Sequence, residues 1–440
     1  MTDGKPTRKK RPRTVPPTPT PIPDYEILDD NIVDPLATVL WGSLRDLREW
    51  ASTEPMHRTK LFSRPKLGSA KRVRVASASA PGLADPLARL RALRASPRKV
   101  RPGDIVAACS EIYAWADARG MAMTAVAFSE TAAVIDPENP ILSIEAGKAT
   151  RNAAMPDRSE IWFERGIQLA ARKKSRRELI RGLLGYGALL TDLDRLPEAQ
   201  KKIDRASRLA AQTRRHRQAA EAAHDLLGLA ILAAAYDDAE RFALEAIQSY
   251  PIHHPSVPTL VHDWAFHLVR MKLYAEALPL LVQSVSAAKR PDLRMLFAGT
   301  MARAAGGTGR REHYDRAEKI ILTLAESYQR WSAAALANLA EGARFFREWD
   351  NGERYAARAV AIAAARGEAD VQRGALEILD GIAARVPPAP QQQPPKGSRV
   401  LAINRRLLEL MGRRKKKPRR PVQTDRDQPD PEPGPEITDQ

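Results

Sequence analysis

Apolar residues recur at helical spacing through most of the chain, and one helical pattern is written twice. Residues 236–247 read YDDAERFALEAI, and residues 349–360 read WDNGERYAARAV. Five of the twelve positions are identical, and five more are conservative exchanges such as Tyr for Trp and Ile for Val. A helical pattern that returns after 113 residues indicates a repeat architecture, in which similar helices stack along the chain.

Small residues mark the same repeat at other places in the sequence. If Ala239 and Gly352 are taken as equivalent, a small residue follows a short polar turn at seven positions spaced 34 to 40 residues apart. These positions are Ala125, Ser159, Ala199, Ala239, Ala277, Ala317 and Gly352. Seven residues further on, six of the seven repeats again have a small residue, and the exception is Leu324. Positions seven apart lie on nearly the same helix face, so we expect a neighbouring helix to pack closely there.

Each repeat is expected to contain two helices. Pro137 and Pro251 stand twelve residues after their small residues, where they would end the second helix of the repeat. A single pair of helices cannot bury its apolar face alone, so successive pairs should share one continuous core. The low content of aromatic residues, 5%, and the abundance of Ala, Leu and Arg also favour helices over strands.

These repeats resemble those of the tetratricopeptide-repeat (TPR) family. The resemblance is carried by residues 226–251 (LLGLAILAAAYDDAERFALEAIQSYP), which include a Leu-Gly pair, and by residues 187–210 and 264–285. Residues 124–140 close their repeat as family members do. The resemblance covers about residues 103–385 and implies an all-α fold, a right-handed α-solenoid of about seven TPR-like helix pairs.

The segments on either side of the repeats differ from them in composition. Residues 1–32 are basic and rich in proline, and we expect a disordered tail. Residues 33–102 are expected to hold two short amphipathic helices and a linker, and the first helix should dock on the repeat domain or on another chain. Residues 386–440 are interpreted as a Pro/Gln linker, a short amphipathic helix at 398–412 and a disordered tail that is first basic and then acidic.

The formal net charge of +18 is concentrated in these flanks. Residues 1–102 contribute +11 and residues 386–440 contribute +5, which leaves +2 for the repeats. Within the repeats, however, 14 basic residues face 5 acidic ones between Arg172 and Arg217. Such a local excess is typical of a solvated face, and it would also suit a cationic stretch of groove that binds an acidic peptide.

No residue pattern indicates catalysis, a metal or a cofactor. Cys109 is the single cysteine and lies on a helix face, so it is interpreted as a core residue. Four histidines fall close together, namely His253, His254, His262 and His267. Their spacing does not match the i, i+4 pair that places two metal ligands on one helix face. The glycine-rich stretch around Gly306 lacks the Gly-Lys-Ser/Thr ending of a phosphate-binding loop and is interpreted as a loop between helices.

The sequence therefore predicts a non-enzymatic scaffold or adaptor that binds another protein, such as an acidic peptide segment, in a concave groove. The resemblance places the first helix of each pair on the concave side. The residues expected to face a partner are Arg177, Arg181, Thr191, Asp192, His262, Phe266, Arg270 and Asn338. No catalytic, cofactor-binding or metal-binding residue is predicted.

Two alternatives remain open. The basic runs RKKRPR near the N-terminus and RRKKKPRR near the C-terminus would suit association with nucleic acid. The amphipathic helix and basic cluster at 398–420 would suit peripheral membrane attachment. The sequence shows no signal peptide and no apolar run long enough to cross a bilayer, so we expect a cytoplasmic protein. The oligomeric state is not indicated.

Overall fold

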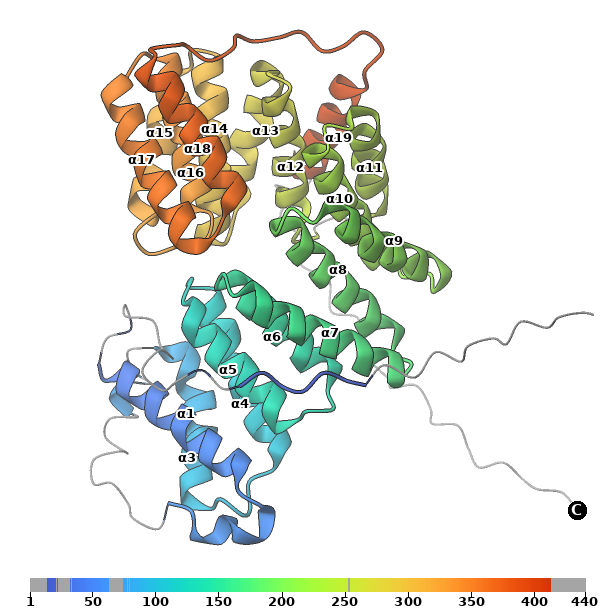
Figure 1. Ribbon diagram of the computed structural model, residues 1–440, viewed down its shortest axis with the longest axis vertical. Helices are drawn as coiled ribbons and strands as arrows, with labels where there is room; N and C mark the ends of the chain where they lie inside the picture. The colour runs from blue at the N-terminus through green and yellow to red at the C-terminus, as the bar shows by residue number, and fades with distance from the viewer. Residues whose placement is uncertain are drawn as a thin grey trace, which may run out of the picture.

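A computed structural model describes residues 14–20, 22, 32, 34–62, 74–76, 78, 80–251 and 254–412. Within these residues the secondary structure is helical throughout, and between Pro102 and Ala383 it forms seven helix pairs followed by a single helix (Figure 1). The pairs are α4 (Pro102–Asp117) with α5 (Ala122–Ile135), α6 (Pro140–Asn152) with α7 (Pro156–Arg172), α8 (Arg176–Asp192) with α9 (Leu196–Gln212), α10 (His216–Leu232) with α11 (Tyr236–Ser249), α12 (Val257–Arg270) with α13 (Tyr274–Ala287), α14 (Pro291–Gly307) with α15 (Arg311–Leu324) and α16 (Ser332–Phe345) with α17 (Trp349–Arg366), followed by α18 (Ala369–Ala383). The predicted all-α solenoid of about seven pairs is confirmed.

The turns within the helix pairs, and those from α7 to α8 and from α9 to α10, share one hydrogen-bonding arrangement. After α7, Lys174 adopts a left-handed conformation with φ 54°. The backbone N–H of Ser175 donates to the Ala170 carbonyl at 2.9 Å, and that of Lys174 donates to the Ala171 carbonyl at 3.1 Å. This is a Schellman motif, which satisfies the last carbonyls of a helix. The left-handed residue returns every twenty residues, at Ala154, Lys174, Asp194, Arg214 and Ala234.

The uniform turns explain the longer repeats in the middle of the chain. Helices α7, α8, α9 and α10 are each 17 residues long, so that a helix and its turn span twenty residues and a pair spans forty. Helices α11, α12 and α13 have 14 residues each. The spacing between the small residues therefore follows helix length.

Small residues do mark the close contacts between helices. All seven residues of the first set are buried, and the second set is buried apart from the half-buried Leu324. A Cβ added to Gly166 would lie 2.7 Å from the Ile144 side chain and 3.2 Å from its backbone nitrogen. The backbone of α7 thus approaches α6 closely at this point.

The contact between α14 and α16 depends on glycine in the same way. A Cβ on Gly299 would lie 2.6 Å from the Ala335 Cα, and one on Gly306 would lie 2.8 Å from the Gly342 carbonyl oxygen. The prediction of a glycine-rich loop here is wrong for Gly306 and Gly307, which lie inside α14, and the turn itself is formed by residues 308–310. Close helix approach, and not chain reversal, accounts for Gly306.

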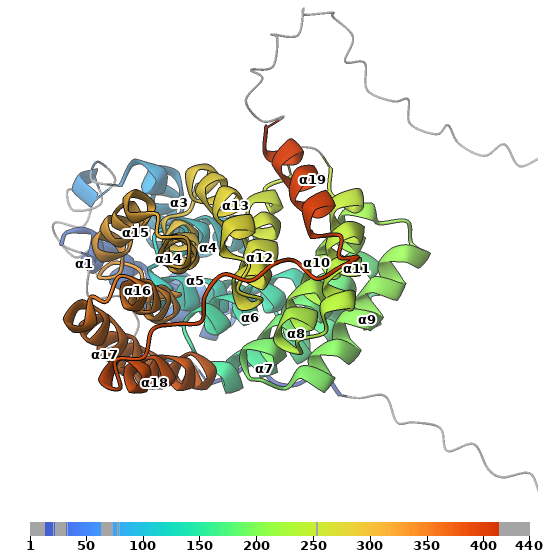
Figure 2. The same ribbon diagram turned by 90° about the horizontal axis from the view of Figure 1, so that it is seen from above.

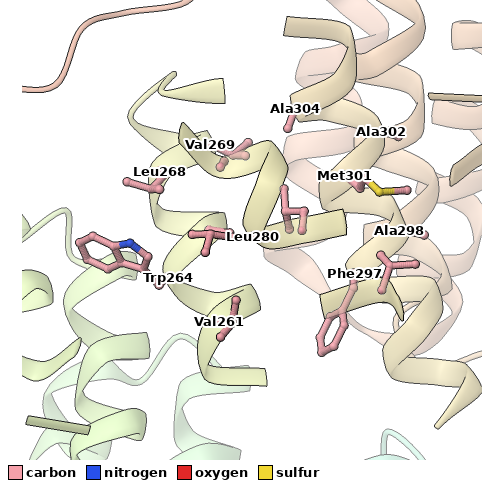
Figure 3. Packing of buried hydrophobic residues seen from close by; sticks show 14 of the residues in the cluster. Val261, Trp264, Leu268, Val269, Leu280, Phe297, Ala298, Met301, Ala302 and Ala304 are labelled. Atoms are coloured by element: carbon pink, nitrogen blue, oxygen red, sulfur yellow. The ribbon is translucent and has the colours of Figure 1, made fainter. Parts of the chain in front are cut away.

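Three adjoining clusters of buried apolar residues join consecutive pairs, in place of the single continuous core expected from the sequence. Trp264 and Leu268 of α12, Leu280 of α13 and Met301 of α14 are completely buried in one cluster (Figure 3). This cluster runs from α10 to α18 and continues into the C-terminal helix described below. Successive pairs therefore stabilise one another, as expected of a solenoid.

The N-terminal helices dock on the first helix pairs. Helix α1 (Leu36–Ser52) is followed by the short 3₁₀ helices η2 (Pro55–Lys60) and η3 (Pro81–Leu83) and by α3 (Ala84–Ala95). Leu40, Leu44 and Leu47 of α1 are buried together with residues of α3, α4 and α5. The Trp50 indole N–H donates to the Pro97 carbonyl at 2.8 Å. The apolar stripe of α1 is thus covered by this same chain.

Part of the predicted N-terminal tail also lies against the repeats. Residues 14–20 are extended, and the Pro16 carbonyl accepts a hydrogen bond from Arg165 Nη1 of α7 at 2.5 Å. The other terminal nitrogen of Arg165 donates to the Pro137 carbonyl at 2.7 Å. A buried arginine thus contacts the backbone of this segment at Pro16. Residues 1–13, with the RKKRPR run, lie outside the described part of the chain.

The largest departure from the sequence prediction is at the C-terminal end. Residues 386–399 run back from α18 across the repeats, and α19 (Val400–Gly412) packs on α11, α12 and α13 (Figure 2). Asn404 accepts a hydrogen bond from Trp264 Nε1 at 2.7 Å and donates one to the Glu276 carbonyl at 3.1 Å. Gln391 accepts from the Ala275 backbone N–H at 2.9 Å. The segment thus lies along the repeats as a strap and connects α18 to α19, which coincides with the short helix predicted at 398–412.

The docked position of α19 also bears on the membrane alternative. The apolar side chains of α19, Val400, Ile403, Leu407 and Met411, are buried against the repeats. In this arrangement they are not available to a lipid surface, so the structure does not favour attachment through this helix. The following RRKKKPRR run and the acidic end lie outside the described residues. No helix in the described ranges is long and apolar enough to cross a membrane.

The stack curves until its two ends touch. Asp117, at the end of α4, pairs with Arg290, just before α14, at 3.0 Å. Gly120, in the turn after α4, lies against Tyr328 of the loop between α15 and α16. Arg366 of α17 donates to the Asn152 carbonyl of α6 at 3.4 Å. The concave side of the solenoid therefore lies inside a ring of helices, in which the first two pairs meet the last two.

Candidate binding channel

The concave side holds two adjoining hollows, both lined mainly by the first helix of each pair. The larger, here called the basic chamber, has a volume of about 850 Å³ and is formed by α6, α8, α10 and the turn between α9 and α10. The second, the apolar chamber, has a volume of about 750 Å³ and is formed by α8, α10, α12, α14, α16 and α18. Both volumes lie within the range of ligand-binding clefts.

The two chambers adjoin along α8 and α10, which contribute residues to both, and together they form the channel described below. On α8, Ala188 lines the basic chamber and Thr191 lines the apolar chamber. On α10, Asp225 and Gly228 have the same relation. Residues three apart lie about one turn from each other on the same side of a helix. The boundary between the chambers therefore lies within about one helical turn on both helices.

Apolar and aromatic side chains form most of the wall of the apolar chamber. Ile231, Phe266, Leu296 and Ile378 come from four different helices. Trp331 precedes α16 in a left-handed conformation with φ 68°, and its buried Nε1 has no hydrogen-bond partner in the described part of the chain. The Nε atoms of Arg303 and Arg344, which also line the chamber, likewise have no hydrogen-bond partner among the described residues. The chamber thus combines an apolar surface with unsatisfied donors.

A buried polar network forms one side of this chamber. Asp263 pairs with His262 at 2.8 Å and with His224 at 2.9 Å. The outer ring nitrogen of His262 lies 3.0 Å from Thr300 Oγ1, and that of His224 lies 3.1 Å from the Tyr250 hydroxyl. Burial alone would raise the pKa of Asp263, but hydrogen bonds from the two histidines outweigh it and hold the pKa below its ordinary range. This network fixes α10, α11, α12 and α14 relative to one another.

A second charged group lies on α16. Arg344 pairs with Glu341, and its Nη2 also donates to the Val386 carbonyl at 2.8 Å. Arg303 of α14 approaches the same carboxylate, at 3.8 Å. These contacts connect the wall of the apolar chamber to the start of the C-terminal strap.

The basic chamber is dominated by cations. It is lined by Lys148 of α6, by Arg177 and Arg181 of α8, and by Arg214 and Arg215 of the turn between α9 and α10. Glu221 and Asp225 of α10 also line it. Burial, and next the charge of Arg181, lower the pKa of Lys148. Burial raises the pKa of Asp225 to about 6. The charged side chains of this chamber thus lie close enough together to influence one another's pKa values.

The structure separates the residues predicted to face a partner into three groups. Thr191, His262, Phe266 and Asn338 line the apolar chamber. Arg177 and Arg181 line the basic chamber. Asp192 is paired with Arg151 of α6 at 2.6 Å, and Arg270 is exposed in the last turn of α12 outside both chambers.

Of the other residues noted in the sequence, His254, His267 and Cys109 lie outside both chambers. His254 stacks on Tyr250 with ring centroids 4.6 Å apart, and His253 lies outside the described residues. Burial lowers the pKa of His267 to about 4. Among the residues that the structure describes, no group of three or more His, Cys, Asp or Glu side chains could hold a metal ion. Cys109 is fully buried, and burial raises the pKa of its thiol to about 12.

Several channel residues were not anticipated from the sequence. Lys148 stands one pair before the basic stretch, Asp225 stands after it, and Trp331 belongs to a loop. Glu341 and Arg344 are three residues apart on α16 and resemble an ordinary surface ion pair in sequence. They are found only when the helices are placed side by side.

Comparisons with known proteins return little. No family model matches the chain, and no curated protein matches its sequence. Among solved structures, the chain is similar to the crystal structure of the apo form of RapI. That similarity has a TM-score of 0.39 at 9% sequence identity and covers 81% of this chain and 89% of that chain. The assignment as a helical-repeat protein rests on the seven stacked pairs themselves.

Proposed function

We propose that this chain is a non-enzymatic scaffold or adaptor of the TPR type, which binds a segment of a partner protein in its concave channel. The observation that carries the proposal is the apolar chamber. The first helices of five consecutive pairs, α8 to α16, and the closing helix α18 all contribute side chains to this one hollow. An apolar hollow of this size on the surface of a protein is typical of a binding site. Apolar anchors would supply affinity there, and the nearby charges would set orientation.

Filling the apolar chamber tests the proposal without removing any packing. Ala334 lines the chamber and is half-buried, so Ala334→Phe adds a ring inside the hollow. Ala361 is exposed on α17 and outside both chambers, so Ala361→Phe is the matched control. Both variants should unfold at the temperature of the parent protein to within a few degrees, since neither side chain is in the core.

The assay is affinity purification from the native host followed by mass spectrometry, with the strongest candidate then measured by calorimetry. We expect Ala334→Phe to weaken binding of that partner at least tenfold, and Ala361→Phe to leave it unchanged. Equal binding by the parent protein and Ala334→Phe would place the partner elsewhere and refute the proposed function.

A further inference from the structure

Three of the cations that line the basic chamber lack the ion pairs that other arginines of the repeats form, whereas a fourth, Arg217, pairs with Glu221 at 3.3 Å. Arg151, Arg290 and Arg366 are paired with carboxylates at 2.6, 2.8 and 2.7 Å. The charged groups of Lys148, Arg177 and Arg181, in contrast, form no ion pair or hydrogen bond within the described ranges. Glu221 and Asp225 line the same chamber, but its cations outnumber these two carboxylates. An excess of positive charge creates a positive potential, which is highest in a hollow.

Burial and the proximity of these cations disfavour the charged form of Lys148. The lowered pKa of Lys148 has burial as its first cause and the charge of Arg181 as its second. An anion placed between these side chains would reverse both effects, because it would restore solvation and offset the repulsion. The chamber is thus suited to carboxylate or phosphate oxygens.

The neighbouring apolar chamber selects between these two kinds of anion. Asp263 and Glu341 line it, and Glu377 of α18 lies there as well. A phosphate backbone that continued along the channel would pass these carboxylates. Single-stranded nucleic acid also needs a succession of aromatic platforms, whereas the aromatic side chains here are Phe266 and Trp331, with His262 beside them. A peptide that changes from acidic to apolar along its length meets no such repulsion.

The geometry of α8 gives the spacing of such a peptide. Arg181 lines the basic chamber and Thr191 the apolar chamber, ten residues further along the same helix. Ten helical residues span about 15 Å, and an extended chain covers this distance in about four or five residues. Glu221 and Ile231 on α10 repeat the same separation.

We propose that the segment bound in the channel is an extended acidic peptide, with carboxylates held by Lys148, Arg177 and Arg181. An apolar or aromatic side chain, about four or five residues away along the peptide, occupies the apolar chamber. This inference rests on the function proposed above and names the chemistry of the partner.

Fluorescent peptides of defined sequence test it with the full-length chain. The first probe carries a cluster of glutamates, a spacer of Gly and Ser, and a phenylalanine about five residues from the cluster. Companion probes exchange glutamate for lysine, exchange phenylalanine for serine, or change the spacer to about two or about ten residues. A single-stranded oligonucleotide of similar length is measured in parallel. Anisotropy at low and at physiological salt gives the affinities.

The protein variants distinguish the chamber from general surface charge. Arg177→Glu with Arg181→Glu reverses two charges inside the basic chamber. Lys201→Glu with Arg205→Glu reverses two charges at the same spacing on the exposed face of α9. We expect the first pair to weaken the acidic–apolar probe at least tenfold and the second pair to change its affinity less than twofold. Far-UV circular dichroism and thermal unfolding of both variants should match the parent protein.

Several results would overturn the inference. The acidic–apolar probe could fail to bind at high micromolar concentration, the lysine probe could bind equally well, or the affinity could be independent of spacer length. The oligonucleotide could also bind more tightly than the peptide, in a way that depends on Arg177 and Arg181. If one of these occurs while Ala334→Phe still abolishes binding of the native partner, the inference fails and the scaffold function stands. If Ala334→Phe leaves that partner bound, the scaffold function itself fails.

Discussion

Replacement of Gly299 by alanine tests whether close approach of helices holds this stack together. A Cβ at this position would lie 2.6 Å from the Ala335 Cα and 3.1 Å from both the Ala335 Cβ and its carbonyl oxygen. None of these atoms can rotate away, because two belong to the backbone and the third is fixed to it. Helices α14 and α16 must therefore move apart to admit a single methyl group.

Two opposing effects set the expected magnitude. Alanine is favoured over glycine inside a helix by about 1 kcal/mol. Overpacking a contact that cannot relax costs about 1–3 kcal/mol, and separation of the helices would also loosen the contact between Gly306 and Gly342 two turns away. The clash outweighs the propensity, so we expect Gly299→Ala to lower the free energy of unfolding by about 1–2 kcal/mol.

Gly374 of α18 supplies a control of the same chemistry. A Cβ at Gly374 would meet no atom within 4 Å, so only the propensity acts and Gly374→Ala should stabilise by about 0.5–1 kcal/mol. The assay is urea unfolding followed by far-UV circular dichroism, with hydrogen exchange of α14 and α16 to detect unfolding by parts. If Gly299→Ala stabilises the protein as much as the control does, close approach of the helices is not what glycine provides here.

Two further changes probe the C-terminal strap and the basic chamber. Asn404→Ala leaves the buried Trp264 N–H without its acceptor, at a cost of about 1–3 kcal/mol. Hydrogen exchange in α19 should accelerate about tenfold or more, whereas exchange in α4 to α8 should stay unchanged. Unaltered exchange in α19 would contradict the docking. Burial raises the pKa of Asp225 from 3.8 to about 6 in the folded state. The folded state therefore loses stability relative to the unfolded state as the pH rises through this window. The loss is about 3 kcal/mol at most, and about 1 kcal/mol after solvent screening in an open chamber. Thermal unfolding should show Asp225→Asn more stable than the parent protein above pH 6 and equal to it near pH 4, whereas an equal gain at both would assign the effect to something other than charge.

The solenoid could be predicted because its main packing rule is written locally. A residue such as Ala239 or Gly166 must be small in each repeat, since the next helix backbone lies against it. That requirement repeats with the helix pair and is visible in one sequence. The twenty-residue unit of helix and turn was not visible, because its left-handed position holds Ala, Lys, Asp and Arg as readily as Gly.

The C-terminal strap could not be predicted because its partners are remote in the sequence. Asn404 and Trp264 are separated by 140 positions. A segment rich in proline and glutamine carries no periodic apolar signal, so its composition indicates a linker whether or not a surface receives it. The one usable sign was the apolar stripe of α19, and its meaning depended on whether α11 to α13 left a place for it.

The candidate site was predicted only to the level of which helices line the channel. Thr191, His262 and Asn338 lie in the apolar chamber because the first helix of each pair faces inward. Asp192 was expected to face a partner, but its carboxylate pairs with Arg151 on the preceding first helix, a contact that no single-helix argument contains. Arg270 occupies the helix end, where position on a helical face no longer determines what a side chain meets.

The curvature of the ring comes from packing between neighbouring pairs more than from the contacts that close it. The closing ion pair joins Arg290, with 38% of its side chain exposed, to Asp117, and such partly exposed pairs contribute about 1 kcal/mol or less. The apolar cluster that runs through the pairs from α10 to α18 instead contains many completely buried side chains, such as Trp264 and Met301, each worth about 1.5–3 kcal/mol. A partner that widened the channel would therefore break the closing contacts first, and both chambers, which lie along the unbroken arc from α6 to α18, would keep their lining.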